Sequence, residues 1–235
     1  MTAGRPTFRF QLERAGSFEM PVLRRHPASQ ACAPLIVFAQ PLFEEHNRAR
    51  RLFADLGRAL AMQGLTSALP DLPRTGDHAD FGPFDMALAR ESLAAFASAQ
   101  PGPVCFVSLR GGALLVPADS RHVALAPVID GDRLLTDLIR AQSVATKEAG
   151  GGGLRRSDAD AQWAEGRHVH LAGYDVSAAT ASDLSRPAPG QPGLTLSIGR
   201  DADLSGPPVW RQADPEATQH LAEEAASRIA KWLAG

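Results

Sequence analysis

The sequence has few cysteines, no long apolar run and almost no net charge. Its 235 residues include two cysteines, and the formal net charge at pH 7 is −2. So small a net charge gives no reason to expect a nucleic-acid partner. No apolar run approaches the roughly 18 residues of a membrane span, and the N-terminal MTAGRPTFRF lacks the apolar region of a signal peptide. We therefore expect a cytoplasmic protein without a membrane span, in which Cys105 stays reduced inside an apolar strand.

Short apolar runs alternate with amphipathic segments along most of the chain. The runs predict strands at residues 34–39, 65–69, 104–108, 122–125 and 194–198, with a further short strand at 168–171. Helical spacing of apolar residues predicts helices at 47–63, 83–100, 132–147, 177–184 and 215–233. The segment 154–167 is polar, and we expect it to be mobile.

The first strand differs from the others because apolar and polar residues alternate in it. Phe8, Phe10 and Leu12 alternate with polar neighbours over residues 7–14, which predicts a strand with one buried face. Residues 20–23 are its expected hairpin partner.

This order of elements predicts an α/β-hydrolase-like fold. We expect a mostly parallel sheet with helices on both faces, because short buried strands alternate with helices. Residues 1–235 would form one domain, with 131–190 as a small cap. Ligands bind at the carboxyl ends of the strands in such sheets, so the loops 40–47, 71–80 and 108–112 should converge on one site.

The stretch VCFVSLRGGALL, residues 104–115, predicts a strand, a tight turn and the start of a helix. A nucleophile elbow has this arrangement, with the pattern G-x-S-x-G. Small residues occupy its outer positions here, Ser108 and Gly112, but Arg110 stands at the nucleophile position. Arginine stays protonated at physiological pH and cannot attack a carbonyl. The sequence thus predicts a hydrolase scaffold with a degenerate site, and whether the protein is an enzyme stays open.

A serine triad is difficult to assemble from the remaining residues. A small residue at the end of this strand usually serves packing, and the loop 205–213, where the base should lie, contains no histidine. The weak candidates for nucleophile, acid and base are Ser108, Asp201 or Asp203, and His220. The Gly111 N–H could be one oxyanion donor, but Pro41 in the loop expected to supply the other has no N–H.

Arg110 has two interpretations. An exposed guanidinium at a helix start could hold a small anionic or acyl ligand. Alternatively it forms ion pairs with acidic residues of the converging loops, which we favour because an unpaired charge there would be costly. The expected members of this ligand-binding or ion-pair network are Arg110, Glu44, Glu45, Asn47, Arg50 and Asp77. Asn47 could also be a helix N-cap.

No group of residues has a complete metal-ligand pattern. His168 and His170 could share one face of a strand, but further ligands would have to come from elsewhere. The loop with Asp71, Asp77, His78 and Asp80 is more simply a solvated acidic loop. We expect neither a metal nor a cofactor.

Several short motifs resemble those of one family, the second type of exosortase-associated hydrolases. Phe43-Glu44-Glu45, Asn47 and Arg50-Arg51 resemble its F-x-E-E-x-N-x-x-R-R motif, and residues 69–77 are similar to its P-D-L-x-x-x-G-D loop. Residues 109–115 resemble its G-L-R-x-G-A-L-L elbow, in which arginine also fills the nucleophile place, and residues 172–174 its A-G-Y segment. The similarity covers residues 34–184. This sequence departs from the pattern at Ser108, where the family has glycine, and in its divergent C-terminal third.

The resemblance implies an α/β-hydrolase fold, a bacterial origin, and genes for exopolysaccharide synthesis and exosortase-dependent protein sorting nearby; it implies no known substrate.

Three functions stay open. The protein could be a degenerate hydrolase that acts as a binding or scaffold protein, or an active hydrolase of an ester or acyl substrate with an atypical site. It could also be an interaction module whose helix 132–147 pairs with a partner or, in a homodimer, with its own copy.

Overall fold

The protein is built around a seven-stranded sheet in the order β1-β2-β4-β3-β5-β6-β9. The computed structural model describes residues 5–28, 32–78, 80, 82–212 and 218–235. The strands are β1 (Thr7–Ala15), β2 (Phe18–His26), β3 (Cys32–Ala39), β4 (Leu65–Pro70), β5 (Val104–Leu109), β6 (His122–Leu125) and β9 (Leu194–Leu196). The strand β2 is antiparallel to both β1 and β4, whereas β4, β3, β5, β6 and β9 run parallel. This topology confirms the predicted α/β-hydrolase-like fold.

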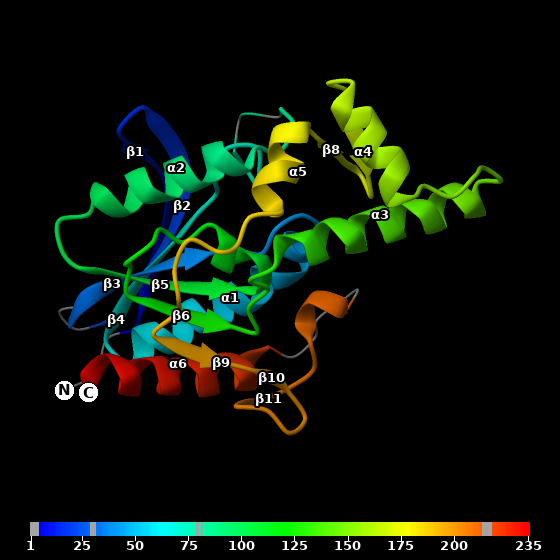
Figure 1. Ribbon diagram of the computed structural model, residues 1–235. Coiled ribbons are helices and arrows are strands. Elements are labelled where there is room, and N and C mark those ends of the chain that lie inside the picture. Colours follow the sequence, from blue (N-terminus) through cyan, green and yellow to red (C-terminus); the bar gives the residue numbers. More distant parts are fainter. Residues whose placement is uncertain (1–4, 29–31, 79, 81, 213–217) are drawn as a thin grey trace.

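Helices cover both faces of the sheet, as predicted (Figure 1). Alternate residues of β3 point to opposite sides: Val37 packs in the cluster that contains α2 (Met86–Ser98), and Ile36 in the cluster with α1 (Glu44–Met62) and α6 (Gln219–Ala234). Cys105 in β5 is fully buried on the second side, and burial raises the pKa of its thiol to about 12. The thiol therefore stays protonated and serves packing.

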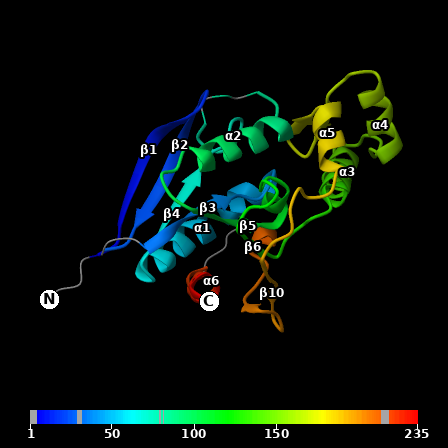
Figure 2. The same ribbon diagram turned by 60° about the vertical axis from the view of Figure 1, so that its left-hand side comes forward.

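Residues 131–184 form a group of elements beside the carboxyl ends of the parallel strands (Figures 1 and 2). The group contains α3 (Gly131–Glu148), α4 (Arg156–Ala164), the hairpin of β7 (Val169–Leu171) and β8 (Tyr174–Val176), and α5 (Ala178–Leu184). The apolar face of α3, with Leu134, Leu135, Leu138 and Ile139, is buried within the molecule. That face is therefore already covered by the chain itself.

In the segment 154–167, which we expected to be polar and mobile, the helix α4 occupies most of the residues. Trp163 fixes this helix: its ring is buried, and its Nε1 donates a hydrogen bond of 2.9 Å to the Val176 carbonyl. The polar composition reflects the exposed side of a short helix with few buried positions, Ala159 and Trp163.

The predicted buried face of the first strand was wrong. Phe8, Phe10 and Leu12 are 64%, 58% and 65% exposed. They lie on an edge strand, on the same face as Leu23 of β2, where α1 and α6 pack against the central strands. The side chain of Arg25 covers part of Phe8, with its guanidinium carbon 4.8 Å from the ring centre.

The starts of α1, α2 and α6 differ from the sequence prediction, and α2 begins at Met86, three residues after the expected start at Pro83. The helix α1 begins at Glu44, with Phe43 as its N-cap, so Asn47 lies inside the first turn and is not the cap. The helix α6 begins at Gln219, and the expected start at Pro215 lies outside the described residues. Ser177 caps α5 as predicted, since its hydroxyl accepts from the Thr180 N–H. Among the helices of the described part, none combines the length and apolar character that a membrane span requires.

Candidate functional site

The turn after β5 has the backbone geometry of a nucleophile elbow. Arg110 follows the last strand residue with φ of 53°, a left-handed conformation that is uncommon for any residue with a side chain. The expected helix is reduced to η1 (Arg110–Leu114), a single 3₁₀ segment. Strained residues of this kind gather at functional sites, where the surrounding structure holds them in place. The turn therefore has the conformation of an elbow, and the cationic side chain of Arg110 is at its tip.

Two side chains hold the Arg110 guanidinium. Its Nε donates to the two carboxylate oxygens of Glu45 at 3.2 and 3.3 Å, and its Nη2 lies 3.2 Å from Glu45 Oε1. The ring of Trp210 lies against the same guanidinium, 4.7 Å from its central carbon. Burial raises the pKa of Glu45, and the charge and hydrogen bonds of Arg110 oppose that rise. The cation is thus in contact with both a carboxylate and an aromatic ring.

Trp210 comes from η2 (Val209–Arg211), within the loop where a hydrolase base would be sought. Its ring is buried, and its Nε1 has no hydrogen-bond partner among the described residues. An aromatic face therefore lies next to Arg110, in a loop without a histidine. The sequence had indicated this absence but not the packing of Trp210 against the elbow.

Ser108 lies below the elbow, within the sheet, and it pairs with a histidine that sequence reasoning missed. Its Oγ is 2.7 Å from His122 Nε2. The two residues belong to neighbouring parallel strands, in which Phe106 is opposite His122 and Ser108 is opposite Ala124. The register between these two strands could not be read from the sequence, so no local sequence pattern indicated the contact between Ser108 and His122.

The Ser108–His122 pair is enclosed by protein. Ser108 is 0% and His122 3% exposed. Burial lowers the pKa of His122 to about 4, and among the described residues no carboxylate opposes this shift. A catalytic triad needs an acid that orients the imidazole and a nucleophile that the substrate can reach. The pair meets neither condition.

The low pKa of His122 predicts acid sensitivity. Below its ordinary pKa of 6.5 the unfolded chain takes up a proton at this histidine, whereas the folded chain does so only near pH 4. The free energy of unfolding therefore decreases as the pH falls through this range, and at pH 5 it should be about 2 kcal/mol lower than at pH 8. Urea unfolding at both pH values measures the loss, and His122→Gln should remove that part of it. An equal loss in this variant would contradict the prediction.

The other triad candidates are not brought together. Asp203 lies next to β11 (Leu204–Ser205), where its Oδ2 accepts from the Ser197 N–H at 2.8 Å and from the Ser197 hydroxyl at 2.6 Å. Asp201 is exposed, and His220 is an exposed residue in the first turn of α6. A Cβ at Gly111 would lie 2.7 Å from Leu134 Cδ1, so α3 packs closely against this residue.

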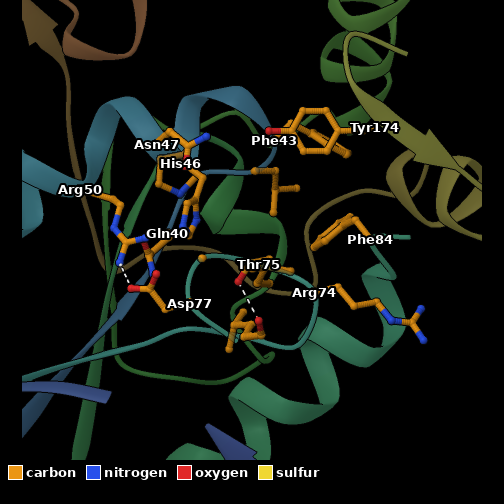
Figure 3. A pocket seen from close by; sticks show the side chains of 15 residues that line it. Gln40, Phe43, His46, Asn47, Arg50, Arg74, Thr75, Asp77, Phe84 and Tyr174 are labelled. Carbon is orange, nitrogen blue, oxygen red and sulfur yellow. Dashed lines mark hydrogen bonds and ion pairs between the residues drawn. The ribbon is translucent and has the colours of Figure 1, made fainter. Parts of the chain in front are cut away.

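A cavity of about 450 Å³ lies at the loops after β3 and β4, and of residues 108–115 only Leu115 lines it. The loop after β3, the first turns of α1 and the loop after β4 form one part of its wall, with Gln40, His46, Asn47, Arg50, Thr75 and Asp77. Phe84 and Tyr174 approach from the segment before α2 and from β8, on the other side of the view in Figure 3. Phe43, with φ of 57°, joins the two parts: its ring packs edge-on against Phe84 and Tyr174.

The predicted network divides into separate groups. Arg50 pairs with Asp77 at 2.9 Å and with the buried Asp71 at 3.6 Å (Figure 3). Glu44 pairs instead with Arg48, at 3.3 Å on the surface. The residues His46 and Arg50 lie four positions apart, on one side of α1, whereas Glu45 is turned by about 100° toward Arg110. The helix therefore separates the elbow pair from the cavity.

The loop after β4 is shaped around Asp71, which explains its P-D-L-x-x-x-G-D pattern. Asp71 is 3% exposed and accepts from the Asp77 N–H at 3.2 Å. Gly76 has φ of 55°, and a Cβ at this position would lie 2.5 Å from Asp71 Oδ1. Only glycine fits here, so the motif specifies the loop that carries Thr75 and Asp77 to the cavity.

The histidines considered for metal binding lie apart from this cavity. His170 of β7 is exposed and pairs with Asp175 of β8, with 2.9 Å between Nδ1 and Oδ1, while His168 lies just before the strand. His78 Nδ1 accepts from the Asp80 N–H at 3.0 Å. Within the described residues, no three His, Cys, Asp or Glu side chains form a group that could hold a metal ion.

No family model and no curated protein matches this sequence. Solved structures do match, among them a cold-adapted esterase from an Arctic intertidal metagenomic library, with 19% identity, TM-score 0.42 and coverage of 60% of this chain and 69% of that one. A structure described as a predicted CIB-like hydrolase from Thermoplasma acidophilum has 15% identity and TM-score 0.44, and the match covers 97% of this chain and 98% of that one.

An α/β serine hydrolase without a lid, from Xanthomonas campestris, matches with 16% identity and TM-score 0.43, over 52% of this chain. The match spans 62% of the Xanthomonas hydrolase, less than two thirds of its length. At such identities a likeness concerns the fold alone, and the fold assignment here rests on the strand order. The chemistry of the site follows from its own geometry.

Proposed function

We propose that this protein is an α/β-hydrolase-fold binding protein whose degenerate elbow performs no serine-based acyl transfer. The observation that carries the proposal is the contact of the Arg110 guanidinium with both the Glu45 carboxylate and the Trp210 ring. A guanidinium has no free electron pair for attack on a carbonyl. The elbow then acts as a structural junction, and the adjoining cavity is the part of the site that is open to a ligand.

An active hydrolase with an atypical site is the alternative, and the Ser108–His122 hydrogen bond favours it. Burial of both residues opposes it, as does the lack of a carboxylate beside His122 in the part of the chain that the structure describes. Fluorophosphonate probes label serines activated by a base, which separates the two proposals. We expect no labelling of the wild-type protein under conditions in which an active serine esterase is labelled completely. Labelling that disappears in Ser108→Ala would establish the alternative.

We also propose that the protein acts beside bacterial exopolysaccharide synthesis and exosortase-dependent protein sorting. The support is the motif resemblance over residues 34–184, in which the elbow arginine and the Asp71–Asp77 loop take part. Deletion of the gene in its source bacterium should then reduce secreted exopolysaccharide or the sorting of surface proteins. Complementation with a Tyr174→Leu variant, altered in the cavity, should restore less than the wild-type gene. Unchanged secretion and sorting in the deletion strain would contradict this role.

A further inference from the structure

The cavity wall contains two buried polar atoms that lack a hydrogen-bond partner among the described residues: Gln40 Oε1 and His46 Nε2. Gln40 is 5% and His46 7% exposed, so bulk water satisfies neither atom well. A buried polar atom without a partner costs free energy, and such atoms are rare in native proteins. Two of them at one cavity leave hydrogen bonds that a bound molecule can make.

The orientation of the Gln40 amide fixes what it requires from a ligand. Its Nε2 donates to the Pro70 carbonyl and to Asp71 Oδ1, both at 3.3 Å. The opposite orientation would place the amide oxygen against these two acceptors, which would repel it. The free Oε1 is therefore an acceptor, and it needs an O–H or N–H donor.

His46 complements this requirement. Burial lowers the pKa of its imidazole, so the ring is neutral near pH 7. A neutral imidazole nitrogen either accepts a hydrogen bond or donates one, depending on the tautomer. A ligand hydroxyl can donate to Gln40 Oε1 while it accepts from a His46 N–H. Figure 3 shows the two side chains next to each other on one side of the cavity.

The rest of the lining disfavours an anion and suits a ring. Arg50 is paired with Asp71 and Asp77, and Arg74 lies 3.1 Å from Asp80 and 3.9 Å from Asp85. Both lining arginines thus already have two carboxylates each. The lining also contains side chains that offer apolar faces and edges for a ring; they are Leu42, Phe43, Phe84, Leu115 and Tyr174.

We infer that the cavity binds a neutral ligand with an apolar-faced ring and at least one hydroxyl, which hydrogen-bonds to Gln40 and His46. The inference deepens the proposed function and rests on its claim that the protein works by binding. It replaces the anionic ligand that the sequence suggested. Phenols and sugar rings share this chemistry, and the choice of probes separates them.

Nitrogen NMR of protein labelled with ¹⁵N-histidine tests the inference directly. The His46 signals are those that disappear in His46→Phe, and those of His122, assigned with His122→Gln, are the internal control. Phenol or methyl glucoside should shift His46 Nε2 and leave His122 unchanged. Anisole, which lacks the hydroxyl, and benzoate, which is charged, should bind about tenfold more weakly than phenol, the cost of one lost hydrogen bond.

A second variant tests the site independently of whether His46→Phe folds. Tyr174 is half-buried in a short hairpin, so Tyr174→Leu should fold and yet weaken phenol binding about tenfold through loss of the aromatic wall. His170→Phe, in the same hairpin but outside the cavity, should bind as the wild type does. The site is disproved if neither hydroxylated probe shifts His46, or if anisole or benzoate binds as tightly as phenol. Fluorophosphonate labelling that depends on Ser108 would instead disprove the proposed function and leave this assignment in place.

Discussion

Gly112→Ala is expected to lower the free energy of unfolding by about 3 kcal/mol, at the upper end of the usual cost of overpacking. An added Cβ would lie 2.2 Å from the Ala39 carbonyl oxygen and 2.6 Å from that of Gln40. Both atoms belong to the backbone at the end of β3, so neither can rotate away. The elbow or the strand end would have to move, and Gln40 would leave its position at the cavity.

The neighbouring glycine provides a matched control. A Cβ at Gly111 would lie 2.7 Å from Leu134 Cδ1, the flexible end of a side chain, so Gly111→Ala should cost only about 1 kcal/mol. Gly102→Ala meets no atom within 4 Å and should be nearly neutral. Urea unfolding of the three variants measures these differences. Equal losses in Gly111→Ala and Gly112→Ala would show that the contact with the β3 backbone is not what requires glycine at 112.

The sequence allowed the layered fold to be predicted because its causes are local. Short apolar runs, helical periodicity and glycine or proline breaks determine where strands and helices occur, and alternation of the two implies a parallel sheet. The elbow was visible for the same reason, since residues 108–112 are contiguous. The exposure of Phe8 and Phe10 was not visible in the sequence, because how far a helix covers the sheet depends on packing across the whole sheet.

The site was predicted only in part, because its contacts join distant segments. Glu45 and Arg110 are 65 positions apart, and Trp210 reaches the same place from the C-terminal third. His122 was read as an ordinary strand residue because its contact with Ser108 depends on the register between β5 and β6. Only a structure could show that Gln40 Oε1 and His46 Nε2 lack hydrogen-bond partners among the described residues, because no sequence pattern indicates which polar atoms are unpaired.

Arg110→Met is expected to cost about 2 kcal/mol of unfolding free energy at pH 7, mainly because it leaves the Glu45 carboxylate without its partner. The two side chains are 17% and 20% exposed, so the cost should fall below that of breaking a fully buried pair. Glu45→Gln should cost a similar amount, because the guanidinium then keeps only Trp210 beside it. The pKa of Glu45 should rise further in Arg110→Met, since burial already raises it and Arg110 opposes that rise.

The double variant decides whether Arg110 is a structural cation or a free ligand-binding group. If the pair is structural, Arg110→Met with Glu45→Gln should cost about 1 kcal/mol less than the sum of the single changes. Arg110→Gly is the conformational control, because glycine accepts φ of 53° without strain and should recover part of the loss in Arg110→Met. If the losses of unfolding free energy in the single variants add up in the double variant, and the pKa of Glu45 is the same in Arg110→Met, the ion pair contributes nothing to stability. The guanidinium would then be available to a ligand. Coupling with partial recovery by glycine would instead show that the elbow keeps its strained backbone through this ion pair, in place of the chemistry that the conformation serves in serine hydrolases.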